Sequence, residues 1–525
     1  MSKIMPMRGF LTSCPGVSPL TACSIGVTFA AVVALAPAPP ATAATAPAGS
    51  AVPGSTQSLP LVPLARERVL GAAPEQGLYR TGLARFALVG VVWDDPGSEL
   101  HGRVQVRTRS AATGQWSGWQ DVETHTADHG ADPGTAEGLA PRLRGGTAPL
   151  WVGESDGVDL RVRAEGSGGA PGRRAGGPRP PLPSGLRLEL VDPGKDGGHG
   201  EGSGDGDEGT GAVEAGVSEA LDAAEADEAG EVLEALEAEE AKARQTQKGD
   251  EAGDAGERPP GNLPADDPPR TAVDTEAAIA ASGANADITD FGATAIPELD
   301  REATERELSR LQGTALDDPA RAKPYIGPRP RIVTRRGWGA DESLRERGFV
   351  YTTKVKAAFV HHTASGNKYT CAQAPSVIRS IYRYHVKSMG WRDIGYNFLV
   401  DKCGTIYEGR AGGVAKAVLG AHTLGFNTNS TGIAVIGTYG SAQPSSSAVT
   451  AVARLTAWKL GLYGANPLGK TYLTSGGGNL YPKGKNVRLN VISGHRDGFA
   501  TECPGKRLYA KLGTARSSAA TYQGR

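Results

Sequence analysis

A long tract of low complexity, residues 196–325, divides this chain, because its composition collapses into glycine, alanine, aspartate and glutamate. Such a sequence offers too few apolar side chains to offset the entropy lost when a chain becomes ordered. The whole chain, at 525 residues, is also too long for one ordinary core. We therefore predict an acidic Gly/Ala/Pro-rich linker over 196–325 with a folded region on either side. Within it, 214–244 is either one exposed helix or disordered.

The first 44 residues are typical of a secretory signal peptide. Lys3 and Arg8 supply positive charge, and the apolar stretch 25–36 is too short to span a bilayer. Small residues at 41–44 offer a cleavage site, and the prolines before them disfavour the alternative, a membrane anchor. We expect a secreted or cell-wall-associated protein with no integral membrane segment after the signal is removed. The net charge of −1 gives no reason to expect a nucleic-acid partner.

The region 55–195 predicts a β-rich module, because short strands alternate there with Gly, Pro and Asp. The predicted strands lie at 86–93, 104–108, 158–162 and 186–190. Their number and spacing favour a small sandwich. Trp116 and Trp119 would suit stacking on a carbohydrate, but packing on a sheet or hairpin is the interpretation we favour. Binding of the cell wall is a hypothesis for the role of this module.

The region 326–515 predicts an α/β domain with a mixed sheet flanked by helices. Apolar, β-branched runs predict strands at 357–363, 396–401, 405–408, 432–439 and 488–493. Helical periodicity marks 373–389 and 446–464, and Gly464 would stop the second helix.

The chain has five cysteines, an odd number, so they cannot all form disulfides within the chain. Cys14 and Cys23 would leave with the signal peptide, so Cys371, Cys403 and Cys503 remain. In an oxidising compartment two of these should pair and one should serve another purpose. A disulfide between Cys371 and Cys403 leaves Cys503 for a metal ion, whereas a disulfide through Cys503 would abolish that site. The sequence leaves both pairings open.

Two histidines and a cysteine in the last third of the chain suggest a metal site. His361 lies in a predicted strand, His495 follows another, and Cys503 comes shortly after. Two imidazoles and one thiolate are ligands that zinc accepts, and three protein ligands leave the fourth tetrahedral position open, as in catalytic sites. An alternative is a cysteine peptidase that uses Cys503 and His495, but this leaves His361 unexplained.

Beyond these residues, ordered motifs extend over nearly all of 326–515. They are RIVTRRGWGA (331–340), HHTA (361–364), DIGYNFLV (393–400), YEGR (407–410), GAHT (420–423), and His495 with Cys503. Together they resemble the peptidoglycan recognition protein family, which shares its fold with zinc N-acetylmuramoyl-L-alanine amidases of the phage-lysozyme type. The likeness extends more loosely to secreted actinobacterial members with a β-rich N-terminal region. It does not cover the linker.

The resemblance implies that His361, His495 and Cys503 hold a zinc ion that cleaves the amide between the lactyl group and L-alanine of peptidoglycan. His362 would then serve packing, because neighbouring strand residues point to opposite faces. Tyr396 would donate a hydrogen bond to the oxyanion or the attacking water, and Thr501 would orient the water or donate a hydrogen bond.

For the glycan strand and stem peptide, the resemblance implies contacts from His422, Arg410 and Trp391. Family members selective for one stem-peptide type follow the arginine with Gly-Trp, whereas this chain has Ala411-Gly412-Gly413, so the preferred stem peptide stays open. We expect His385 to be a core histidine and Glu502 to be solvated. The alternative function is a binding protein of the same fold that does not hydrolyse peptidoglycan.

Overall fold

The computed structural model describes residues 54–64, 75–124, 129–164, 181–194, 275–313 and 324–525. The predicted signal peptide and the stretch 214–244 lie outside the described residues. Within the described residues, no helix is long and apolar enough to cross a membrane.

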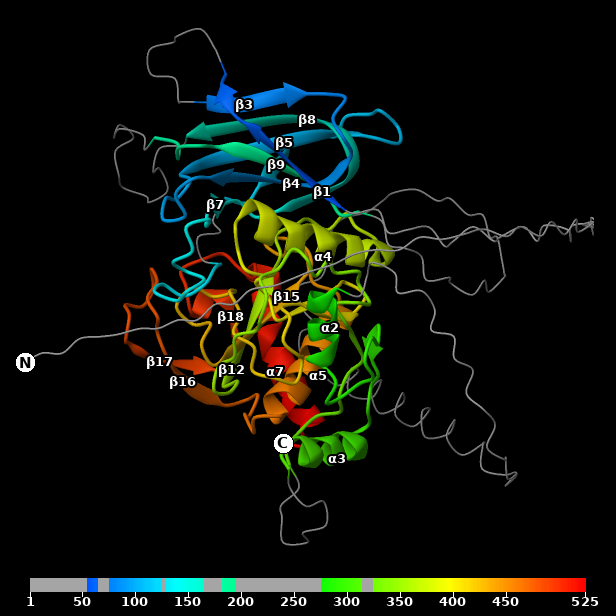
Figure 1. Cartoon of the computed structure of the whole chain (residues 1–525). Coiled ribbons are helices and arrows are strands. Elements are labelled where there is room, and N and C mark those ends of the chain that lie inside the picture. The colour runs from blue at the N-terminus through cyan, green and yellow to red at the C-terminus, as the bar shows by residue number, and fades with distance from the viewer. Residues whose placement is uncertain (1–53, 65–74, 125–128, 165–180, 195–274, 314–323) are drawn as a thin grey trace, which may run out of the picture. The chain divides into compact units, whose positions relative to one another are not determined.

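The N-terminal module, residues 54–194, is built from antiparallel strands, which confirms the all-β prediction (Figure 1). The strands are β1 (Ser55–Pro60), β2 (Val62–Pro63), β3 (Glu75–Arg80), β4 (Phe86–Trp93), β5 (Gly102–Ser110), β6 (Gln120–Val122), β7 (Gly145–Gly146), β8 (Leu150–Ala164) and β9 (Arg187–Asp192). The long strand β8 pairs with β4 through its first residues and lies between β3 and β5 through the rest. It thereby joins two sets of strands, which bury one apolar cluster.

The two tryptophans of this module pack against arginines on the sheet. The guanidinium of Arg107 lies 5.2 Å from the ring centroids of both Trp116 and Trp119. Arg161 lies over Trp119 at 4.3 Å. Such stacks are cation–π contacts of modest strength at exposed sites. The structure therefore shows the packing against the sheet that we expected.

The C-terminal domain, residues 275–313 and 324–525, contains the predicted mixed sheet. Its strands stand in the order β10 (Ala295–Ile296), β11 (Ile332–Val333), β14 (Ile406–Glu408), β13 (Phe398–Val400), β15 (Ser430–Val435), β12 (Ala357–His362) and β18 (Ile492–Gly494). Strand β12 lies between β15 and β18, and both of these pairings are parallel. The carboxyl ends of these three strands therefore meet at one edge of the sheet.

Helices cover both faces of this sheet (Figure 1). Ile433 of β15 packs in the same cluster as α5 (Ser446–Gly461) and α7 (Leu512–Tyr522), whereas the adjacent Ala434 packs with α4 (Ala374–Arg383). This alternation is the period of a strand buried on both sides. The cluster around α4 also contains apolar residues of the N-terminal module, among them Leu88 and Trp151, so the module and the domain share a core.

The predicted linker is too long at its C-terminal end. Residues from 275 onward form α2 (Glu276–Gly283), β10 and α3 (Arg301–Leu311), and β10 adds a strand to the sheet. Ile288, Ile296 and Leu308 are buried in the core of the domain. The prediction was wrong because these apolar residues are few and widely spaced in an acidic sequence, so the average composition of the region hides them.

The predicted strand at 488–493 is two strands. β17 (Asn486–Asn490) pairs with β16 (Lys470–Thr474) in a separate hairpin, and β18 joins the main sheet beside β12. Helix 373–389 is also divided: after a 3-10 turn (Cys371–Gln373) and α4, the chain forms one π-helical turn, Tyr384–Ser388. Single π turns often occur at functional sites.

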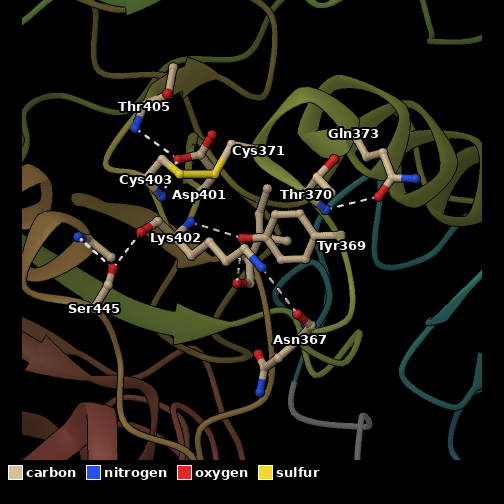
Figure 2. Close-up of a disulfide and its surroundings, with 12 residues drawn as sticks. Asn367, Tyr369, Thr370, Cys371, Gln373, Asp401, Lys402, Cys403, Thr405 and Ser445 are labelled. Carbon is tan, nitrogen blue, oxygen red and sulfur yellow. Dashed lines mark hydrogen bonds between the residues drawn. A yellow bond between two sulfur atoms is a disulfide. The ribbon is translucent and has the colours of Figure 1, made fainter. Parts of the chain in front are cut away.

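A disulfide joins Cys371, at the start of the α4 region, to Cys403, in the turn between β13 and β14 (Figure 2). The same turn is held by the Asp401 carboxylate, which accepts hydrogen bonds from the backbone N–H groups of Cys403 and Thr405, both at 2.9 Å. The first of the two pairings left open by the sequence is thus confirmed, and Cys503 is not in a disulfide.

We expect the double variant Cys371→Ser/Cys403→Ser to unfold more easily than the wild type by about 3.7 kcal/mol. This is the chain-entropy value for a closed loop of this length, and it applies because the bond spans a sequence separation of 32 residues. Urea unfolding in the presence of excess chelator measures it without a contribution from metal binding. A variant as stable as the wild type would show that the disulfide does not restrict the unfolded chain.

Candidate metal centre

The predicted ligands His361 and His495 meet because their strands are neighbours. His361 lies near the carboxyl end of β12, and His495 directly follows β18, which pairs in parallel with β12. Their Nδ1 atoms lie 3.1 Å apart, and Cys503 Sγ lies 3.8 Å from His361 Nδ1. All three side chains are buried. The structure therefore brings together the three residues that the sequence singled out.

A short loop carries Cys503 back to the histidines. The N–H of Arg496 donates to the carbonyl of Cys503 at 3.0 Å, which closes the loop at its ends. The N–H of Cys503 donates to Thr501 Oγ1 at 3.1 Å. Thr501 therefore holds the turn that presents the thiol, and its role toward water stays a proposal.

A fourth group with a ligand atom comes from the N-terminal module. His129 lies on the segment between β6 and β7. The ligand atoms of four residues, which are one ring nitrogen each from His129, His361 and His495 and the sulfur of Cys503, all lie within 4.8 Å of one another. Three imidazoles and a thiolate are a donor set that suits zinc. Sequence reasoning missed His129, because no local pattern places residue 129 beside strands more than two hundred residues away.

The electrostatics of the centre favour neutral imidazoles. Burial, followed by the nearby rings of His495 and His422, lowers the pKa of His361 well below its usual value. A histidine must be neutral to bind a metal ion. The opposite nitrogen of His361, Nε2, lies 3.2 Å from His422 Nδ1. A hydrogen bond of this kind fixes the orientation and tautomer of a ligand histidine.

His422 itself is fully buried, with its Nε2 3.4 Å from Ser430 Oγ. The structure thus places it behind His361, where it contacts a predicted ligand, and we now propose a positioning role in place of substrate contact. The neighbouring His362 contacts a different set of atoms, since its Nδ1 accepts a hydrogen bond from the N–H of Tyr439 at 3.3 Å. This agrees with the expected alternation along the strand.

Tyr396 lies beside the ligands, with its ring centroid 5.6 Å from that of His361. It lines a pocket together with Trp391, His385 and His129. Trp391 stacks on His385 with a centroid distance of 4.3 Å, and His385 Nδ1 accepts a hydrogen bond from the N–H of Gly395. His385 is therefore a hydrogen-bonded core histidine, as expected.

Arg410 is buried and already paired. Its guanidinium makes two parallel hydrogen bonds, of 2.8 and 2.9 Å, to the carboxylate of Glu137 in the N-terminal module. Arg410 Nε also donates to the carbonyl of Ile394 at 2.8 Å. Glu502, next to a ligand in sequence, is exposed and faces Arg496 at 3.2 Å, which agrees with a solvated side chain.

Each of the two folded regions matches the model of a known protein family. Residues 351–506 match the family model described as N-acetylmuramoyl-L-alanine amidase. Residues 40–182 match the model described as Rv3811 N-terminal galactose-binding domain-like.

Individual relatives match the C-terminal domain. Peptidoglycan-recognition protein SC2 of Drosophila simulans is 30% identical over 183 residues, which are 35% of this chain and 85% of the relative. The human N-acetylmuramoyl-L-alanine amidase is 32% identical over 187 residues, 35% of this chain and 28% of the relative. The solved structure of Drosophila PGRP-LB is 26% identical, with a TM-score of 0.28, and covers 35% of this chain and 92% of that one. The chain belongs to the peptidoglycan recognition protein family.

Proposed function

We propose that this protein is a secreted, zinc-dependent N-acetylmuramoyl-L-alanine amidase, which hydrolyses the amide between the lactyl group and L-alanine in peptidoglycan. The observation that carries the proposal is the convergence of His361, His495 and Cys503, since His361 Nδ1 lies 3.1 Å from His495 Nδ1 and 3.8 Å from Cys503 Sγ. The disulfide supports export, because disulfides persist in oxidising compartments.

In this proposal the two Nδ1 atoms and the thiolate hold zinc. A bound zinc ion supplies a Lewis acid for the amide carbonyl and lowers the pKa of water toward neutrality. His422 keeps the ring of His361 in place through its contact with Nε2. Thr501 keeps the Cys503 sulfur at the site through the turn that it caps.

We assign to Tyr396 the stabilisation of the negative charge that develops on the carbonyl oxygen during hydrolysis. Its ring adjoins that of His361 and lines the pocket beside the ligands. A phenol there can donate a hydrogen bond to the oxyanion formed when the carbonyl is attacked, and such donors are worth more in a buried site than in water. The side chains lining the pocket would exclude bulk water from the reacting amide.

The second candidate function is binding without hydrolysis. The presence of Cys503 favours the enzyme, since the resemblance implies that family members without catalysis typically lack this ligand. A cysteine peptidase would use only Cys503 and His495 and would need no third group. His361 Nδ1, however, lies 3.1 Å from His495 Nδ1 and 3.8 Å from Cys503 Sγ, as expected if the three residues bind one ion.

A defined muramyl peptide distinguishes the three functions. We expect the full chain to split it into the sugar acid and a peptide with a free L-alanine amine. Chelator should stop the reaction, and added zinc should restore it. Cleavage that persists in chelator would support the peptidase, and tight binding without cleavage, in the wild type and in the variants below, would support the receptor.

A further inference from the structure

We propose that the N-terminal module is a built-in inhibitor of the metal centre. In this inference, which rests on the proposed function, His129 fills the fourth position on the metal ion and Glu137 occupies Arg410 in place of a stem-peptide carboxylate. Both residues belong to the cover segment, residues 129–144, which leads into β7. The inhibitor is therefore part of the same chain as the site that it closes.

His129 lies close enough to the other three donors to share a metal ion with them. Its ring centroid lies 4.5 Å from that of His495 and 5.3 Å from that of His361. One nitrogen of its ring lies within 4.8 Å of the ligand atoms of His361, His495 and Cys503. Zinc with four protein ligands has the closed coordination of a structural site, whereas hydrolysis needs one position for water or substrate. With His129 bound, the centre is closed.

Glu137 imitates a substrate group. Its carboxylate makes the fork-to-fork contact with Arg410 that a carboxylate ligand would make, and both side chains are buried. The N–H of Arg392 adds a further bond to Glu137 at 3.2 Å. A stem-peptide carboxylate can take this place, because one carboxylate then replaces another and no buried charge is left alone.

Asp132 anchors the cover segment between these two points. It accepts hydrogen bonds from Gly425 N at 2.8 Å and from Asn427 Nδ2 at 2.7 Å. Asn427 Oδ1 in turn accepts from the N–H groups of His422 and Thr423. The cover segment is thus tied to the loop that carries the residue behind His361. Within nine residues, 129–137, the cover segment therefore supplies His129 to the metal centre, Asp132 to the loop that contains His422, and Glu137 to Arg410.

The first test measures the metal directly. In the full chain, His129→Ala should lower zinc affinity by at least about 10-fold in competition with a chelator, because even the loss of a group that only supports a ligand costs about 10- to 100-fold. The visible spectrum of the cobalt-substituted protein should change as one nitrogen ligand is replaced by solvent. His101, an exposed histidine of the same module, provides the matched control, and His101→Ala should change neither. Unchanged affinity and spectrum in His129→Ala would overturn the assignment.

The second test measures the arginine. Glu137→Gln should bind a muramyl peptide that ends in a free carboxylate at least tenfold more tightly than the wild type does, and the corresponding peptide amide no better. Glu99→Gln is the control, because Glu99 is an exposed carboxylate of the same module and faces His101, not Arg410. Equal affinity of Glu137→Gln and wild type for the free carboxylate would contradict mimicry by Glu137.

Hydrolysis separates this inference from the proposed function. We expect His129→Ala/Glu137→Gln to cleave the muramyl peptide at least tenfold faster than the wild type at saturating zinc. A slower double variant that keeps its near-ultraviolet circular dichroism would refute inhibition. If no variant cleaves while the cobalt spectrum still responds to His129→Ala, the ligand assignment holds and the amidase proposal fails.

Discussion

Cys503→Ser is expected to lower zinc affinity by at least about 100-fold and to reduce hydrolysis to background, because a hydroxyl is a poor replacement for a thiolate ligand. The change is small in volume and Cys503 is not in the disulfide, so the fold should be retained. Equilibrium dialysis with zinc and the rate of muramyl-peptide cleavage measure the two effects. The Cys371→Ser/Cys403→Ser variant is the control for loss of cysteine, and below its unfolding midpoint it should keep its zinc.

Hydrolysis by Cys503→Ser at the wild-type rate would show that the ligand set is wrong. Retained affinity for the intact muramyl peptide is part of the expected result, because Arg410 and the pocket beside Tyr396 are not altered. The measurement should also be made with His129→Ala present, since His129 can keep a third nitrogen at the site when the sulfur is lost.

Tyr396→Phe is expected to lower kcat by roughly 100- to 1,000-fold, the effect of removing one donor to an oxyanion. Zinc affinity should be unchanged, since in this account the imidazoles and the thiolate at the centre, and not the phenol, supply the ligand atoms. Tyr463→Phe is the matched control: that hydroxyl donates to the carbonyl of Ala415 at 2.9 Å, and the residue packs against the core. An unaltered kcat in Tyr396→Phe would remove Tyr396 from the chemistry.

Several elements could be predicted because one local pattern determined them. The prediction for β4 has the observed bounds, 86–93, because the strand is an apolar run that ends at a turn. The prediction for β12 differs by one residue, because the apolar run that opens it continues into the two histidines. α5 begins where its N-cap, Ser445, accepts a hydrogen bond from the N–H of Ala448. His361 and His495 converge because the order of β12 and β18 places the carboxyl ends of these strands together, and a short loop returns Cys503 to them.

The missed features depend on contacts between distant segments. Ile296 joins the sheet only because β11 offers a free edge to pair with, and its acidic surroundings gave no sign of this. The division of 486–494 into two strands reflects two different partners, β16 and β12. His129 and Glu137 stand in a polar, glycine-containing segment, and only the packed N-terminal module shows that they reach His495 and Arg410.

One measurement tests the central claim most directly: mass spectrometry of a muramyl peptide cleaved in water enriched in oxygen-18, with the zinc-loaded wild type and His129→Ala. Hydrolysis transfers the oxygen of water to the carbonyl carbon, breaks the C–N bond and leaves the proton on the amine. We predict one heavy oxygen in the lactyl carboxylate and an unlabelled peptide with a free L-alanine amine. An intact lactyl–alanine bond in both proteins, or a label at a peptide carboxylate within the stem, would contradict the account.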